Sequence, residues 1–166
     1  MSSFKFSCIL LLLVMVCFNS RAQSPDQKKK DNYAELKNRI ESKKYLFQAQ
    51  SATTQKGRTI QLTSAYTLKL NNDSLQVDLP YYGRAYTSQY PPTDLSLRFN
   101  SNQFGYVADT TKKGGWDITI SEPKNSSGVS KINLFISSSG YCTIRVTSND
   151  RDMISFYGTI AALSDR

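Results

Sequence analysis

Most of the chain alternates between apolar and polar residues with a period of two, the pattern of strands that bury one face. The clearest segment is 59–70, where Ile60, Leu62, Tyr66, Leu68 and Leu70 alternate with polar residues. Similar alternation marks 45–49, 75–79, 95–99, 104–108, 116–120, 132–136, 142–146 and 154–160. The pattern predicts about eight or nine short antiparallel strands.

Turn-forming residues separate these segments. Asn71–Asp73, Lys112–Gly115 and Ser137–Gly140 each join two alternating runs and are rich in residues that favour tight turns. Many short strands with such spacing indicate a mainly β fold, either an antiparallel β-sandwich or a small β-barrel.

A helical pattern precedes the strands. Tyr33, Leu36 and Ile40 recur at helical spacing after Asp31, a residue suited to the N-cap. We therefore expect a helix at about 31–44, packed on the sheet through a narrow apolar stripe. Residues 23–30 are polar and predict a flexible tether. A single β-rich domain is then expected over 31–166.

The first 22 residues have the pattern of a secretory signal peptide. Lys5 precedes an apolar run from Cys8 to Phe18, and small residues lead to a cleavage site near Ala22. The run is shorter than the roughly 20 residues that span a bilayer, and no later segment is long enough. Export to the periplasm or cell envelope of a Gram-negative bacterium is expected. A lipid anchor at Cys17 is the alternative, although the Val16 before it does not suit lipoprotein processing.

Composition removes several kinds of chemistry. The chain has 0 histidines, which excludes imidazole-based triads, histidine-bound metals and histidine proton shuttles. After signal cleavage, Cys142 is the remaining thiol, and its alternation with Ile144 predicts a buried side chain. We expect no catalytic residues, no metal and no cofactor.

The net charge of +8 is concentrated near the N-terminus. Lys28, Lys29 and Lys30 belong to a solvated helical region or make a weak contact with an anionic surface. Nucleic acid is not an expected partner, because no nucleic-acid-binding motif is present.

The segment Asp78–Tyr90 concentrates aromatic residues between two predicted strands. Tyrosine and arginine are favoured at binding surfaces because they combine flat apolar area with polar groups. In one interpretation the segment is a surface for an envelope partner or small ligand. In the other it folds over an open end of the sheet as a lid, with Arg84 held by backbone carbonyls or Asp78. The candidate site residues are Tyr81, Tyr82, Arg84, Tyr86 and Tyr90.

A second charged cluster lies in the predicted turn that contains Asp150, Arg151 and Asp152. Two carboxylates could act as acid and base, or join Asp73 around calcium, but the spacing fits no known metal loop. Aspartate is also common in turns because it bonds the local backbone. Trp116, which alternates with Ile118, is expected in the core.

Several stretches together resemble the domain of unknown function 4251 family, which consists of exported proteins of Bacteroidota. They are Gly57-Arg58, Leu62–Lys69, Asn72–Ser74, Leu79–Tyr86, Val146–Asn149 with Arg151, and Ile154–Gly158. The resemblance covers about 44–161 and implies an exported β-rich domain. It implies no activity and no catalytic residue.

The sequence therefore predicts an exported, non-enzymatic β-domain that binds a partner or ligand. One alternative is a carrier, similar in shape to a lipocalin, with an apolar ligand inside a barrel lined by Tyr66, Phe99, Tyr106 and Phe156. The other is a hydrolase that uses carboxylates or tyrosine.

Overall fold

The computed structural model describes residues 25–86, 96–121 and 128–163. The predicted signal peptide and its cleavage site lie outside these ranges. The chain divides into two compact units, Met1–Asp31 and Asn32–Arg166. The described part of the first unit is the beginning of one helix, and the second unit contains the sheet.

Helix α2 spans Pro25–Glu41, so it starts six residues before the predicted helix and also ends earlier. Residues 25–30, which we predicted as a tether, are helical. Proline fits the first helical turn because its missing N–H needs no partner there, and Asp26 favours the positive end of the helix dipole. The helix stops because Lys43 adopts a left-handed conformation, with φ of 52°, immediately before the first strand.

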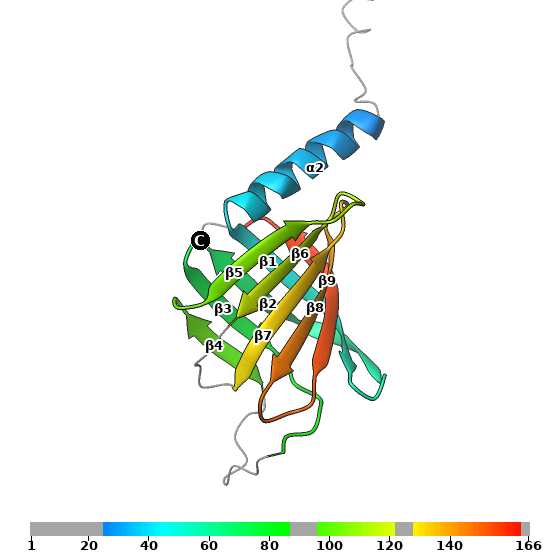
Figure 1. Cartoon of the computed structure of the whole chain (residues 1–166). Coiled ribbons are helices and arrows are strands. Elements are labelled where there is room, and N and C mark those ends of the chain that lie inside the picture. The colour runs from blue at the N-terminus through cyan, green and yellow to red at the C-terminus, as the bar shows by residue number, and fades with distance from the viewer. Residues whose placement is uncertain (1–24, 87–95, 122–127, 164–166) are drawn as a thin grey trace, which may run out of the picture. The chain divides into compact units, whose positions relative to one another are not determined.

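In the ranges that the structure describes, nine antiparallel strands form one curled half-barrel sheet, in the order β4-β3-β2-β1-β9-β8-β7-β6-β5 (Figure 1). This confirms the predicted mainly β, antiparallel fold, although one curled sheet replaces the two separate sheets of a sandwich. The strands are β1 (Lys44–Thr54), β2 (Thr59–Asn71), β3 (Ser74–Leu79), β4 (Leu97–Ser101), β5 (Gly105–Thr110), β6 (Trp116–Ser121), β7 (Val129–Ile136), β8 (Tyr141–Ser148) and β9 (Ile154–Ala161).

Two runs of sequential hairpins meet at the pairing of the first strand with the last. β1 pairs with β9 in a register that places Phe47 opposite Ile160. At Ala49 and Gly158 the strands come so close that a Cβ on Gly158 would overlap the carbonyl of Gln48. Beyond this point the register shifts at a bulge in β1, which bends the sheet. The close approach of the two strands therefore requires glycine at position 158.

The concave side of the sheet is filled by the alternating apolar residues. Phe47, Leu134 and Phe156 have no exposed surface, and Trp116 and Cys142 are buried as predicted. Phe99 is also buried, while Tyr66 and Tyr106 pack against this core. Phe156 has no accessible surface, so no cavity large enough for water borders its side chain. This packing offers no support for the carrier alternative.

The part of helix α2 that belongs to the second unit packs on one end of this core. The ring of Tyr33 stacks on Trp116 with centroids 5.4 Å apart, and Leu36 and Ile40 are buried. Both hairpin turns that precede β6 and β8 contain a glycine with positive φ, Gly114 and Gly140. Within the described residues, no helix has the length and apolar character needed to cross a membrane.

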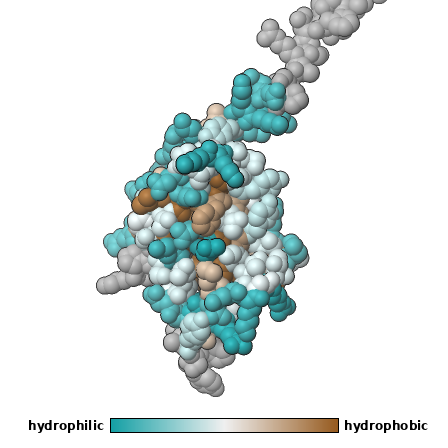
Figure 2. Space-filling view, turned by 45° about the vertical axis from the view of Figure 1, so that its right-hand side comes forward, coloured by the Kyte–Doolittle hydropathy of each residue, from teal (hydrophilic) through white to brown (hydrophobic). Residues whose placement is uncertain are grey.

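The outward-facing side of the sheet is more polar. Figure 2 brings the side of β8 and β9 forward and shows apolar residues gathered among neutral and hydrophilic ones in the middle of this face.

Candidate functional site

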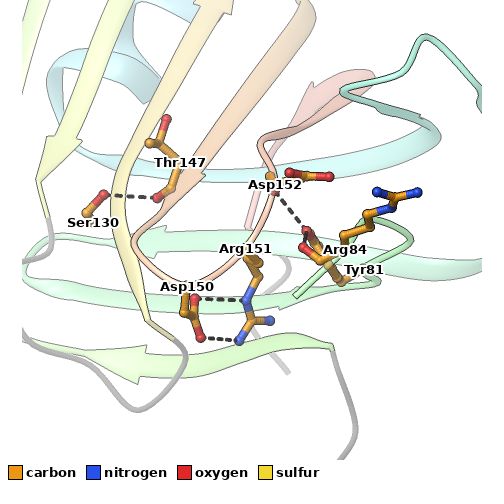
Figure 3. Close-up of polar contacts among 7 residues, drawn as sticks. All are labelled: Tyr81, Arg84, Ser130, Thr147, Asp150, Arg151 and Asp152. Atoms are coloured by element: carbon orange, nitrogen blue, oxygen red, sulfur yellow. Dashed lines mark hydrogen bonds and ion pairs between the residues drawn. The ribbon is translucent and has the colours of Figure 1, made fainter. Parts of the chain in front are cut away.

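The segment that follows β3 and the turn between β8 and β9 meet at one end of the sheet (Figure 3). Ala85 and Arg151 form an isolated antiparallel bridge. Two backbone hydrogen bonds close this bridge. The amide of Tyr86 donates to the carbonyl of Asp150 at 2.8 Å, and the amide of Asp152 donates to the carbonyl of Arg84 at 2.9 Å. The bridge fixes a stretch of chain that has no regular secondary structure.

Tyr81 anchors this contact from inside. Its side chain is 8% exposed, and its hydroxyl lies 2.8 Å from the carbonyl of Arg84 and 2.9 Å from that of Asp152. Burial, followed by the charge of Asp152, raises the pKa of Tyr81 from 10.0 to about 12. The ring also packs on Gly83, where an added Cβ would overlap the hydroxyl.

Arg151 lies beneath the same tyrosine. Its guanidinium is 5.2 Å from the centroid of the Tyr81 ring and donates to both carboxylate oxygens of Asp150, at 3.1 and 3.2 Å. The hydrogen bond from Arg151 lowers the pKa of Asp150. An Asp150 carboxylate that is ionised and engaged by arginine is poorly suited to accept or donate a proton in catalysis.

Gly128 supports the turn from the side of β7. It has a positive φ of 71°, and a Cβ at this position would overlap the Asp150 carboxylate. Its carbonyl accepts a hydrogen bond from the amide of Asn149 at 3.1 Å. Glycine at position 128 thus leaves room for the ion pair of Asp150 and Arg151.

Three other candidate residues face outward, and we call Tyr82, Arg84 and Tyr86 the loop rim. The side chains of Tyr82 and Tyr86 are 42% and 67% exposed, and Arg84 is also exposed. The Tyr86 hydroxyl donates to the carboxylate of Asp152, which raises the pKa of Tyr86. The pKa of Tyr82 is raised by burial and by the neighbouring Tyr66.

Arg84 does not form the contact that the lid interpretation assigned to it. Asp78 pairs instead with Arg98 on the adjacent strand β4, at 3.1 Å. Within 25–86, 96–121 and 128–163, the Arg84 guanidinium has neither an ion pair nor a hydrogen bond. Its backbone carbonyl, not its side chain, holds the loop. Tyr90, the fifth candidate, lies outside the described residues.

The structure thus divides the predicted site between the two interpretations. Tyr81 is buried and closes the end of the sheet, while the loop rim faces solvent. Sequence reasoning identified the charged turn but did not join it to the tyrosine segment. One signal in the sequence could have indicated this contact. The stretches that carry the family resemblance include both segments: Leu79–Tyr86, and Val146–Asn149 with Arg151.

The structure shows no metal-binding cluster or reactive thiol in the parts of the chain that it describes. No group of three or more carboxylate, thiol or imidazole side chains comes together there, so Asp73 does not join Asp150 and Asp152 around an ion. Cys142 is buried, and burial raises the pKa of its thiol well above the ordinary value. A neutral, inaccessible thiol is a poor nucleophile.

Comparisons with known proteins agree with this fold. The family described as a domain of unknown function, DUF4251, matches residues 27–160. The chain is also similar to the crystal structure, at 1.95 Å resolution, of a DUF4251 family protein from Bacteroides eggerthii DSM 20697, with a TM-score of 0.56 and 16% sequence identity. The similarity covers 79% of this chain and 87% of that chain, and at this identity it concerns the fold alone.

A comparison with curated proteins finds no significant match. The family match extends over most of the chain, includes nearly all of the described sheet, and agrees with the resemblance found in the sequence. The chain belongs to the DUF4251 family of domains of unknown function.

Proposed function

We propose that this protein is an exported, non-enzymatic binding domain of the cell envelope, which holds a partner or ligand on the loop rim. The observation that carries the proposal is the exposure of Tyr82, Arg84 and Tyr86 on a segment whose backbone is fixed. Tyrosine offers contact area with few rotatable bonds, so little entropy is lost when it becomes buried in a complex.

The anchoring of the segment favours binding further. Tyr81 and the bridge between Ala85 and Arg151 hold the rim in one conformation before a partner arrives. A preorganised surface avoids part of the ordering cost of association. The guanidinium of Arg84 is unpaired within the described residues, and a guanidinium can bind a carboxylate, a phosphate or a backbone carbonyl of a partner.

Affinity capture from the envelope fraction of the source bacterium tests the role of the rim. Immobilised wild-type protein is compared with the double variant Tyr82→Ala/Arg84→Met. The matched control is Lys69→Met, which removes an exposed cation from the outer side of β2. We expect the same molecule to be retained by the wild type and the control and lost from the double variant. Retention of that molecule by the double variant would overturn the proposal.

Melting temperatures separate loss of binding from loss of folding. Substitutions of exposed residues usually change stability by less than about 0.5 kcal/mol. The rim variant should therefore melt close to the wild type. A large decrease in its melting temperature would show that the rim, like Tyr81, closes the sheet.

Export has its own test. The pattern of Lys5, the apolar run and the small residues before Gln23 supports cleavage near Ala22. Intact-mass measurement of the protein from the periplasm should give a chain that starts at Gln23 without lipid. A mass that corresponds to a lipid on Cys17 would show an anchored protein instead.

A further inference from the structure

A second exposed aromatic cluster lies on the outer side of the sheet, away from the loop rim in sequence. Phe135, Tyr141 and Tyr157 are 41%, 51% and 44% exposed. Alternation places them opposite the buried Leu134, Cys142 and Phe156 of the same strands. Single exposed aromatic residues are ordinary, but a cluster on adjacent strands marks a binding surface.

The cluster is centred on Thr143 of β8. Thr143 pairs with Phe135 on β7 and with Tyr157 on β9. Tyr141 and Arg145, two residues before and after it, lie on the same side of β8. We call Phe135, Tyr141, Thr143, Arg145 and Tyr157 the aromatic face.

The rings of the aromatic face are held in defined positions. The planes of Tyr141 and Tyr157 are inclined by 11°, with centroids 6.0 Å apart. The Arg145 guanidinium lies 5.8 Å from the centroid of Phe135. No ion pair or hydrogen bond of the Arg145 side chain is found within the described ranges. Two nearly parallel rings thus stand beside an available cation.

Charge indicates the sign of the ligand. The strands β7, β8 and β9 contain no aspartate or glutamate in their sequences, whereas they carry Lys131 and Arg145. Two carboxylates lie beyond Phe135 in the same row: Asp117 on β6, opposite Phe135, and Asp109 on β5, opposite Asp117. Among the strands β5 to β9, the positive charge is therefore confined to β7, β8 and β9, the strands of the aromatic face, where Arg145 complements an anionic group.

The position in the sheet indicates the class of the ligand. Each of β7, β8 and β9 is paired on both sides, so a peptide cannot add to any of them as an extra strand. Uncharged hydrogen-bonding side chains lie beside the rings, because Thr159 pairs with Tyr141 and Thr143 with Tyr157. Flat rings with hydroxyls and a cation suit sugar rings that carry carboxylates.

We propose that the aromatic face binds an acidic polysaccharide. Sugar rings pack on Tyr141 and Tyr157, and a sugar carboxylate pairs with Arg145. This inference does not depend on the loop rim or on its partner.

The test uses polygalacturonate, a polymer of uronic acid, as the probe in affinity electrophoresis of the full chain. Dextran is the neutral control and polyglutamate is the acidic peptide control. Sodium chloride at about 150 mM screens non-specific attraction between the basic chain and a polyanion. The variants Tyr157→Ala and Arg145→Gln are compared with Lys69→Gln and Tyr82→Ala, which make matched changes elsewhere.

We expect polygalacturonate to retard the wild-type chain and dextran and polyglutamate to leave it unaffected. Loss of the stacking ring or of the guanidinium should weaken binding about tenfold, because such contacts contribute about 1.4 kcal/mol or more. Lys69→Gln and Tyr82→Ala should bind as the wild type does. If Tyr82→Ala binds polygalacturonate as the wild type does, the aromatic face binds it independently of the loop rim.

Three results would overturn the proposal. The first is no binding of polygalacturonate. The second is equal weakening by Lys69→Gln and Arg145→Gln, which would show attraction by net charge alone. The third is binding of polyglutamate with the same dependence on Tyr157, which would assign the aromatic face to acidic peptides.

Discussion

The hydroxyl of Tyr81 lies 2.9 Å from the backbone carbonyl of Asp152, across a sequence separation of 71 residues. The same hydroxyl is 2.8 Å from the carbonyl of Arg84. One side chain therefore joins the segment after β3 to the turn between β8 and β9. Four predictions follow from this contact and from the surrounding core.

Replacement of Tyr81 by phenylalanine should lower stability. The variant keeps the ring but removes the hydroxyl, so the carbonyl of Asp152 loses this donor, while the carbonyl of Arg84 keeps the amide of Asp152. A buried polar group that loses its partner costs about 1 to 3 kcal/mol. Urea unfolding at neutral pH measures the change, and a variant as stable as the wild type would show that the hydroxyl does not hold the loop.

Replacement of Tyr45 by phenylalanine should raise the stability of the fold or leave it unchanged. The Tyr45 hydroxyl is completely buried beside the hydroxyl of Tyr106, but the two do not meet with the geometry of a hydrogen bond, and neither has another partner among the described residues. Removal of the Tyr45 hydroxyl relieves the cost of burying an unpaired hydroxyl, so we expect Tyr45→Phe to be neutral or to stabilise by about 1 kcal/mol. A marked loss of stability would show instead that the hydroxyls of Tyr45 and Tyr106 are hydrogen-bonded to each other.

Alanine at position 83 should disturb the anchor. A Cβ on Gly83 would overlap the Tyr81 hydroxyl, whereas one on Gly105 would make ordinary contact with Ser121 at 3.5 Å. We expect Gly83→Ala to cost about 1 to 3 kcal/mol, the range for overpacking. Gly105→Ala is the matched control and should melt near the wild type. Similar melting temperatures for both variants would contradict the predicted overlap.

Alkaline pH should weaken the fold through Tyr81. Its pKa is about 12 in the folded chain against 10.0 for an ordinary tyrosine, so the folded state favours the protonated phenol. The resulting stability is complete below about pH 10 and is lost as the pH rises towards 12. A pKa shift of two units corresponds to at most about 3 kcal/mol of unfolding free energy.

The comparison with Tyr81→Phe isolates this contribution. Unfolding free energies of both proteins are measured from pH 8 to pH 12. The difference in unfolding free energy between them should shrink above pH 10, because only the wild type loses the contribution of Tyr81. Burial also raises the pKa values of Tyr45 and Tyr106, but both residues are present in both proteins, so their contributions cancel. A constant difference would show that Tyr81 does not titrate in this range.

The antiparallel strands could be predicted because each buries one face. Alternation identified the core positions of β3, β6, β7 and β8 residue by residue, for example Ile118, Leu134 and Ile144, which are all buried. The turns were equally clear, since Asn72 adopts the positive φ that its sequence context favours. The helix start was missed because lysine-rich segments fit both a helix and a solvated tether.

The candidate site was predicted in part. Tyr81, Tyr82, Arg84 and Tyr86 were identified as a group, but their composition could not show which rings face the core. The aromatic face escaped notice because its members come from three strands, and only their pairing around Thr143 brings them together.

The sequence by itself determined the strands, the turns and the core, because these depend on local periodicity and on residues that fit special backbone angles. It also determined which chemistry is absent, since the chain has 0 histidines. Only the tertiary structure decided that β1 pairs with β9 to make one curled sheet, and that Tyr81 turns inward while its neighbours face solvent. These features depend on contacts between residues far apart in the chain, and local patterns carry no record of such contacts.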